Sequence, residues 1–408
     1  MSTVASKKRT LEAAALNDDA PLGCDYHTTP PIPINVILDF ILPFVRDRYT
    51  WNSICSANKE LYAAGMRLTP EWLRTKVRLG QNVRVSKFSP CGSFLACGAY
   101  SPPYLVYIYG RRGRQLACLS GHTAGIVHLS FSKDGNYLAS AGGSDADKVI
   151  RIWPSNTAQL PQKSEQMLQG HRRSIECLDF SPDDSNILAS GDSSTVKLWN
   201  VEQEVCIHNF NHEEAFPLRE HTCIRSMFFY PRGDEGHKCV FLREDMTMIR
   251  MCLDNPSRIE SHIRDMPFLH GQVQTSAFSP CGSLLALAYH LQYGDEVVIT
   301  LCSLSSGRIA SVLDNVPFGD CMRRHDAFLA FSPDGKYLVK DLNGCEMLVF
   351  RGLHNLSVKT QTGLYDSDGA PSSTWAVAFD PSGEFMATAG WDQSFRLWKV
   401  RGLSFSVV

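Results

Sequence analysis

One five-residue signal recurs seven times and constrains the fold of this 408-residue chain more than any other feature. It consists of Phe, any residue, Pro or Lys, any residue, and then Gly or Asp. Its copies begin at Phe88, Phe131, Phe180, Phe229, Phe278, Phe331 and Phe379. Successive copies are 43, 49, 49, 49, 53 and 48 residues apart. A nearly constant period of this size indicates one supersecondary unit that is copied around or along an axis.

Each unit follows the same order of strands and turns. An alternating run such as Ile126–Phe131 predicts a half-buried strand that ends at the Phe. The signal itself has the Pro, Asp and Gly of a tight turn. A second strand follows, as in Tyr137–Gly142, and a third ends on a bulky residue such as Trp153. With a fourth, outer strand, the unit is the blade of a β-propeller, so the sequence predicts a mainly β, seven-bladed propeller.

From about residue 75 to residue 408 the chain resembles the WD-repeat family. Gly121-His122 and Gly170-His171 stand where that family has its Gly-His pair. The resemblance implies a structural hydrogen-bond relay of His, Ser or Thr, Asp and Trp within a blade. The residues that match it are His122, Ser140, Asp147 and Trp153, then His171, Ser190 and Trp199, and finally Thr388, Asp392 and Trp398. In the third blade, Ser193 is expected in the Asp position. Because these side chains recur with the repeat, we interpret them as structural rather than catalytic or metal-binding.

Composition excludes several function classes. The net charge is −2 with acids and bases interspersed, which does not favour nucleic acid or an anionic membrane as a partner. The longest apolar stretch, Val36–Val45, contains Asp39 and Pro43 and cannot span a bilayer. The N-terminus lacks the apolar region of a secretion signal. The 14 cysteines form no Cys-x-x-Cys pair and are expected to be mostly buried and reduced. These features predict a monomeric protein of the cytoplasm or nucleus, without metal or cofactor.

The sequence predicts three regions: a disordered tail over residues 1–29, a helical domain over 30–72 and the propeller over 73–408. The helical domain resembles an F-box. Its matching residues are Ile32-Pro33, Ile37-Leu38, Leu42-Pro43, Asp47, Ile54-Cys55, Lys59 and Tyr62, whereas Asn35 and Trp51 depart from that family's pattern. The resemblance implies an apolar face that binds a Skp-type adaptor through Ile37, Ile41, Phe44 and Ile54. An F-box before WD repeats is similar to the substrate receptor of a cullin-type ubiquitin ligase. The alternative is a helical cap on a scaffold without a ubiquitin link.

The top face of the ring, where the first strand of each blade begins, is the expected site for a protein partner or peptide degron. By family resemblance, the residue four before each repeated Phe and the residue before each relay Asp point there. The candidate partner-binding residues are Arg84, Glu176, Asp192, Arg225, Gln274, Trp375 and Trp391. Because the last blade closes against the first, Trp375, Trp391 and Arg84 are expected to be neighbours.

Several interpretations of this site stay open at this stage. The two Trp rings can hold a cationic side chain between them, or they can pack an apolar anchor. Alternatively, Trp391 only covers a blade edge and Trp375 fills the core. The arginines favour a phosphate, but Glu176 and Asp192 oppose it. Catalysis is not expected, since the inner strands are apolar or small and no Gly-rich phosphate loop occurs. The strand that closes the ring is expected from either residues 73–79 or residues 403–408.

Overall fold

The computed structural model describes residues 76–110, 113–155, 166–211, 224–233, 236–243, 247–252, 259–263, 271–291, 297–304, 309–316, 328–341, 346–351, 358–363, 374–401 and 404–407. The chain divides into two units, Met1–Thr69 and Pro70–Val408. All described residues belong to the second unit. The predicted tail, the predicted helical domain and its residues Ile37, Ile41, Phe44 and Ile54 therefore lie outside the described residues.

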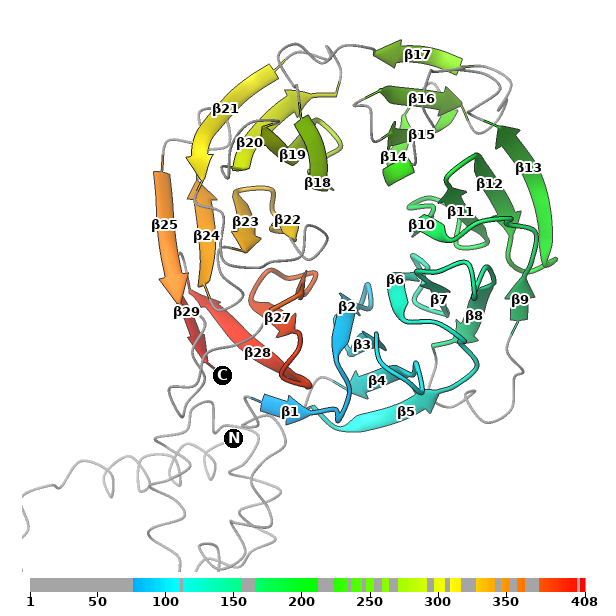
Figure 1. Cartoon of the computed structure of the whole chain (residues 1–408), viewed down its shortest axis with the longest axis horizontal. Coiled ribbons are helices and arrows are strands. Elements are labelled where there is room, and N and C mark those ends of the chain that lie inside the picture. Colours follow the sequence, from blue (N-terminus) through cyan, green and yellow to red (C-terminus); the bar gives the residue numbers. More distant parts are fainter. Residues whose placement is uncertain are drawn as a thin grey trace, which may run out of the picture. The chain divides into compact units, whose positions relative to one another are not determined.

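The described residues of the second unit form antiparallel sheets, six of which contain four consecutive strands (Figure 1). The first sheet contains β2 (Val83–Phe88), β3 (Phe94–Ala99), β4 (Val106–Gly110) and β5 (Gln115–Leu119). The second contains β6 (Ile126–Phe131), β7 (Tyr137–Gly142), β8 (Ile150–Pro154) and β9 (Gln166–Leu168). The third contains β10 (Ile175–Phe180), β11 (Ile187–Asp192), β12 (Thr195–Asn200) and β13 (Val205–Asn211).

The next three sheets repeat this order. The fourth contains β14 (Ile224–Gly233), β15 (Gly236–Arg243), β16 (Met248–Cys252) and β17 (Ile259–Ile263). The fifth contains β18 (Gly271–Phe278), β19 (Leu284–Leu291), β20 (Val297–Ser303) and β21 (Ile309–Val316). The sixth contains β22 (Leu329–Phe331), β23 (Tyr337–Asp341), β24 (Glu346–Arg351) and β25 (Val358–Gly363). In Figure 1 the first strand of each sheet lies nearest the centre and the fourth lies outermost, as in the blades of a propeller.

The seventh sheet is built from both ends of the second unit. It contains β26 (Ala376–Phe379), β27 (Phe385–Ala389) and β28 (Ser394–Arg401), to which β1 (Lys76–Arg78) and β29 (Ser404–Val407) are added. β1 pairs with the first residues of β28, Ser394 to Arg396, whereas β29 pairs with the last, Trp398 to Arg401. The sequence predicted either end as the closing strand. Both are used, because β28 is eight residues long and each short strand covers only part of its outer edge.

The repeated signal forms the turn between the first and second strands of a sheet. In the second sheet, the Ser132 hydroxyl donates to Asp134 Oδ1 at 2.6 Å and accepts from the Tyr137 amide at 2.9 Å. Gly135 has φ 71°, in the left-handed region that favours glycine. Six of the seven copies have the Phe at the last position of the first strand. Phe229 instead lies within β14, because β14 and β15 continue pairing to Gly233 and Gly236.

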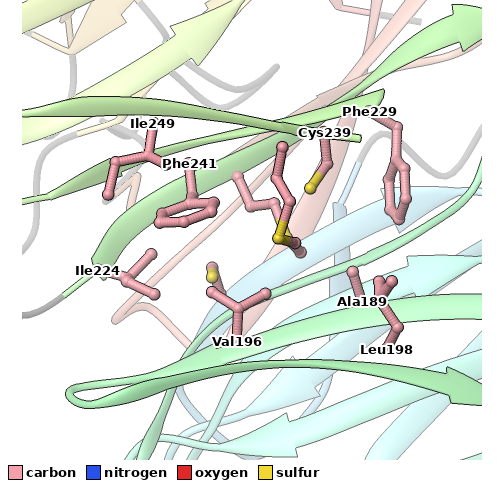
Figure 2. Close-up of a cluster of buried hydrophobic side chains, with 11 residues drawn as sticks. Ala189, Val196, Leu198, Ile224, Phe229, Cys239, Phe241 and Ile249 are labelled. Carbon is pink, nitrogen blue, oxygen red and sulfur yellow. The ribbon is translucent and has the colours of Figure 1, made fainter. Parts of the chain in front are cut away.

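The core lies between neighbouring sheets. Figure 2 shows one such cluster, in which Ala189, Val196 and Leu198 of the third sheet face side chains of β14, β15 and β16. The seven clusters of buried apolar residues join successive sheets around the ring. One of them packs Val83 and Leu95 of the first sheet against Ala387 and Phe395 of the seventh, so the ring of sheets is closed. Each sheet is therefore held by its neighbours rather than by an apolar core of its own.

The sequence predicted that the cysteines are mostly buried and that the chain does not span a membrane. Among the cysteines that the structure describes, the predicted burial holds for five and fails for four: Cys97, Cys177, Cys239, Cys252 and Cys302 are buried, whereas Cys91, Cys118, Cys206 and Cys281 are exposed. The exposed ones lie in turns and outer strands, where one side of the backbone faces solvent. Within the described ranges, no helix is long and apolar enough to cross a bilayer.

Candidate functional site

A buried relay links four side chains of the second sheet. His122 Nδ1 is 2.6 Å from Asp147 Oδ2, and His122 Nε2 is 2.6 Å from Ser140 Oγ. Trp153 Nε1 donates to the same Ser140 Oγ at 2.8 Å. The relay ties the loop before β6 to β7, β8 and the loop between them. Because each polar group has a partner away from water, the set stabilises the blade and leaves no free nucleophile.

The third sheet has the same relay with a different carboxylate from the one predicted. His171 contacts Asp192 Oδ2 at 2.8 Å and Ser190 Oγ at 2.6 Å, and Trp199 Nε1 donates to Ser190 Oγ at 2.8 Å. The prediction that Ser193 replaces the relay Asp, and that Asp192 binds a partner, is wrong: Asp192 is only 1% exposed. The loop between β11 and β12 has only two residues, so the carboxylate at the end of β11 reaches the relay histidine. Asp192 Oδ1 also accepts from the amide of Thr195 at 2.6 Å.

The seventh sheet retains only part of the relay. Trp398 Nε1 donates to Thr388 Oγ1 at 2.8 Å. Asp392 instead accepts a hydrogen bond from Arg396, whose side chain is buried and also donates to Ser394 Oγ. This ion pair replaces the His-to-Asp contact at this blade. In the second and third sheets the relay side chains satisfy one another, whereas in the seventh only Thr388 and Trp398 do so and Asp392 pairs with Arg396.

The relay carboxylates have lowered pKa values. Burial is the strongest single influence and raises the pKa of Asp147, but hydrogen bonds from His122 and the Thr123 amide, with the charge of Arg151, outweigh it. Burial likewise raises the pKa of Asp192, and the contacts with His171 and the amides of Ser194 and Thr195 lower it well below the ordinary value of 3.8. Both groups are therefore ionised at neutral pH.

We expect this shift to make the fold acid-sensitive. Because the pKa of Asp192 is lower in the folded chain, its contribution to stability is complete above the ordinary value of 3.8 and is lost as pH falls through the lowered value. In an Asp192→Asn variant, the free energy of unfolding should fall less steeply with decreasing pH than in the unaltered chain. The difference between the two slopes should be up to about 1.4 kcal/mol per pH unit. Urea unfolding of both chains at several pH values below about 4 measures this difference. Parallel curves would contradict the prediction.

A second cluster, here called the aromatic patch, consists of Arg84, Tyr100, Trp375 and Trp391. The Trp375 and Trp391 ring centroids are 4.3 Å apart, and those of Tyr100 and Trp375 are 6.2 Å apart, both edge to face. Arg84 Cζ lies 5.7 Å from the Tyr100 centroid and 5.5 Å from that of Trp375. Trp391 and Tyr100 are 41% and 47% exposed, whereas Trp375 is 9% exposed. The patch is a partly exposed aromatic surface held by a buried ring and an arginine.

The elements of the patch come from both ends of the ring. Trp375 precedes β26 and Trp391 follows β27, whereas Arg84 lies in β2 and Tyr100 follows β3. All four lie at the top face. The amide of Trp375 donates to Ala389 O and that of Tyr100 donates to Asn82 O, both at 2.8 Å. The prediction that Arg84, Trp375 and Trp391 are neighbours is confirmed. Trp375 is buried, however, as in the alternative interpretation that this ring fills the core.

Tyr100 was missed by the sequence analysis. The first blade has no relay Asp, so the rule that selected Trp391 had no reference residue there. In the structure the Tyr100 ring packs on Gly125, where a Cβ would lie 2.6 Å from Tyr100 Cδ2, and this contact leaves no pattern in the sequence. Only glycine fits at position 125, because the Tyr100 ring packs against the backbone of the loop before β6. The patch therefore joins the seventh and first sheets, and Tyr100 also contacts the loop that leads into the second sheet.

The position of Arg84 bears on which ligands the patch can take. Its guanidinium already lies over the rings of Tyr100 and Trp375. A further cation on exposed Trp391 would gain about 0.5–1 kcal/mol.

Of the other predicted partner-binding residues, the two whose side chains are described, Glu176 and Asp192, do not join the patch. Glu176 is partly exposed, and its Oε1 accepts a hydrogen bond from Ser174 at 2.9 Å. Arg225 lies in β14 and Gln274 in β18, but their side chains lie outside the described part of the structure. In the loop of residues 170–174, before β10, the exposed guanidinium of Arg173 lies 3.8 Å from the carboxylate of Asp145, which already faces this arginine. The described residues therefore do not favour phosphate binding.

Comparison with known proteins identifies three of the repeats. The WD40 family, described as "WD domain, G-beta repeat", matches residues 113–154, 162–200 and 364–399. Relatives include protein tipD of Dictyostelium discoideum, 37% identical over 20% of this chain, and the WD repeat-containing protein 26 homolog of Arabidopsis thaliana, 30% identical over 28%. The anaphase-promoting complex subunit cdc20 of D. discoideum is 30% identical over 36% of the chain. The matches span 12%, 18% and 30% of those three proteins.

Proposed function

Because the chain has WD repeats in a β-propeller suited to protein–protein interaction, we propose that it is a non-catalytic module that binds a protein partner through the aromatic patch. The observation that carries this proposal is the pair of exposed rings, Trp391 and Tyr100, held in place by Arg84 and buried Trp375. Exposed aromatic and arginine side chains at a rigid site are the residues that most often dominate binding energy at interfaces.

The finer proposal is that the chain is the substrate receptor of a cullin-type ubiquitin ligase. Its support is the order of residues in the segment 30–72, which resembles an F-box. In this arrangement the segment binds a Skp-type adaptor through an apolar helix face, and the aromatic patch holds the substrate. A separate enzyme transfers ubiquitin. The chain works as a monomer in the cytoplasm or nucleus and needs no cofactor.

The second candidate is a WD-repeat scaffold in which residues 30–72 cap the propeller and have no ubiquitin link. The aromatic patch is equally compatible with this function, because it concerns only the partner at the top face. The two candidate functions differ in what the apolar side chains of residues Ile37, Ile41, Phe44 and Ile54 contact. They bind an adaptor in the first case and pack within the protein in the second.

We expect the intact chain to bind a purified Skp-type adaptor in a pull-down. The double variant Ile37→Asp and Ile41→Asp should lose this binding, because two carboxylates on a buried apolar face are costly to desolvate. Trp391→Ala, at the other end of the chain, should bind the adaptor as the unaltered chain does. If the intact folded chain does not bind the adaptor, the ligase proposal fails and the scaffold remains.

A further inference from the structure

We infer that two segments of this chain are alternative occupants of one strand edge, the outer edge of β28 from Trp398 to Arg401. β29 holds this edge in the structure. When β29 is displaced, the residues that precede β1 pair there instead and lengthen β1. The exchange is a conformational switch beside the boundary between the two units of the chain, and it does not depend on what the aromatic patch binds.

The registers of β1 and β29 meet on the same edge. Both strands run antiparallel to β28, so both follow its outer edge in the same direction. β1 begins with Lys76 opposite Arg396, and β29 ends with Val407 opposite Trp398. Leu397 alone lies between the two paired stretches of β28. The end of β29 and the start of β1 therefore meet head to tail.

A longer β1 needs the positions that β29 holds. Each residue back along β1 moves the pairing one residue forward along β28, so Leu73 would lie opposite Lys399. Ser406 of β29 is paired with Lys399 in the structure. Because one edge position pairs with one strand, β1 can extend beyond Leu397 only when β29 leaves.

The backbone of β28 offers this edge the same hydrogen-bonding groups whichever strand lies on it. The Val400 amide donates to Glu384 O at 2.8 Å, on the side of β27. By the alternation of an antiparallel ladder, the amides and carbonyls of Lys399 and Arg401 face the outer edge. An occupant of the edge must provide backbone partners for these two residues.

The direction of the β1 backbone meets this requirement. The Leu79 amide donates to Gln393 O at 2.7 Å, so every second amide of this strand faces β28. In the same register the amides of Thr75 and Leu73 face β28, whereas the amide of Arg74 points away. A lengthened β1 would therefore satisfy the same groups of β28 as β29 does.

The seventh sheet does not need β29 to stay closed. Val77 and Leu79, in and just after β1, already pack on the core between the seventh and first sheets. The residues before β1 also include strand formers, Trp72, Leu73 and Thr75. Because the two occupants offer similar backbone pairing, a modest difference in binding free energy can shift the population from one to the other.

The exchange moves the start of the paired chain toward the first unit. With β29 in place, Lys76 is the first described residue paired with β28. In the exchanged state it is Glu71, which the register sets opposite Arg401. The first unit ends at Thr69, so the ladder would then begin two residues after that unit.

The test is hydrogen–deuterium exchange at single-residue resolution, by mass spectrometry with electron-transfer fragmentation, on the unaltered chain and on a chain that ends at Gly402. In the shortened chain, the amides of Leu73 and Thr75 should exchange at least about 10-fold more slowly than in the unaltered chain. The amide of Arg74 should not slow, because it points to solvent. Thermal melting checks that both chains are folded.

Two proline variants of the full-length chain repeat the test without shortening it. The amide of Ser406 faces Lys399, whereas that of Val407 points away from β28. Ser406→Pro should therefore displace β29 and slow the exchange of Leu73 as the shortened chain does. Val407→Pro, the matched control, should leave the exchange of Leu73 as in the unaltered chain.

Two results would overturn the inference. One is unchanged exchange of Leu73 and Thr75 in both the shortened chain and the folded Ser406→Pro chain. The other is equal slowing of Arg74 with its two neighbours, which would indicate a structure other than a strand on this edge. Neither result bears on the aromatic patch, so the proposed function is tested separately.

Discussion

Replacing Asp147 by alanine is expected to lower the free energy of unfolding of this chain by about 3–5 kcal/mol. The carboxylate is 3% exposed and has three kinds of partner: the His122 ring, the Thr123 amide and the Arg151 guanidinium. Without it, the guanidinium of Arg151 keeps its bond to Gly121 O and the His122 ring keeps its bond to Ser140, but each loses the partner that balances its buried donor. Removing one member of such a set costs far more than the net value of the bonds, because the others remain desolvated.

Asp145, two residues earlier in the same loop, is the matched control. Its carboxylate is about half exposed, lies 3.8 Å from exposed Arg173 and accepts from the Ser174 amide at 2.7 Å. Water can replace both partners, so Asp145→Ala should cost about 1 kcal/mol or less. Urea unfolding, followed by circular dichroism, measures both variants. Equal losses would show that burial of the relay does not determine its contribution.

Much of the propeller could be predicted from the sequence because its repeated features depend on residues close together in the chain. The turn that follows Phe131 depends on side chains within five residues of one another, such as Ser132 and Asp134. The alternation of the strands is equally local. A feature that depends only on near neighbours is visible in every copy of the repeat, and seven copies reinforce one another.

The errors occur where a contact depends on loop length or on distant segments. Asp192 and Asp147 both reach a relay histidine, but Asp147 stands beyond a four-residue loop after β7, whereas Asp192 is the last residue of β11. Asp147 stands six residues before Trp153, and the same spacing before Trp199 selected Ser193, which is the wrong residue. Tyr100 was missed because its partner Trp375 is more than half the chain away, and the composite outer edge of β28 was missed because it combines both ends of the second unit.

Trp199 and Trp391 provide the second large prediction, because the same substitution should separate folding from binding. Trp199 is 2% exposed, donates to Ser190 Oγ and packs with Ile150 and Leu168 of the neighbouring sheet. Trp199→Ala should therefore lower the free energy of unfolding by about 3–5 kcal/mol, through a cavity between two blades. Trp391 is 41% exposed, and its removal should cost about 1 kcal/mol or less.

The binding measurement should give the opposite order. The ligand for this measurement is a peptide selected from a random library for binding to the unaltered chain but not to the Trp391→Ala chain. Without denaturant, at a temperature where Trp199→Ala is still folded, that variant should retain the affinity of the unaltered chain for this peptide, because Trp199 belongs to the relay of the third sheet and has no part in the patch. Trp391→Ala should lose this affinity while keeping its stability. A Trp199→Ala chain that is folded but weakened in binding to the same degree would show that the top face depends on the rigidity of the whole ring. The exposed rings alone would then not account for recognition.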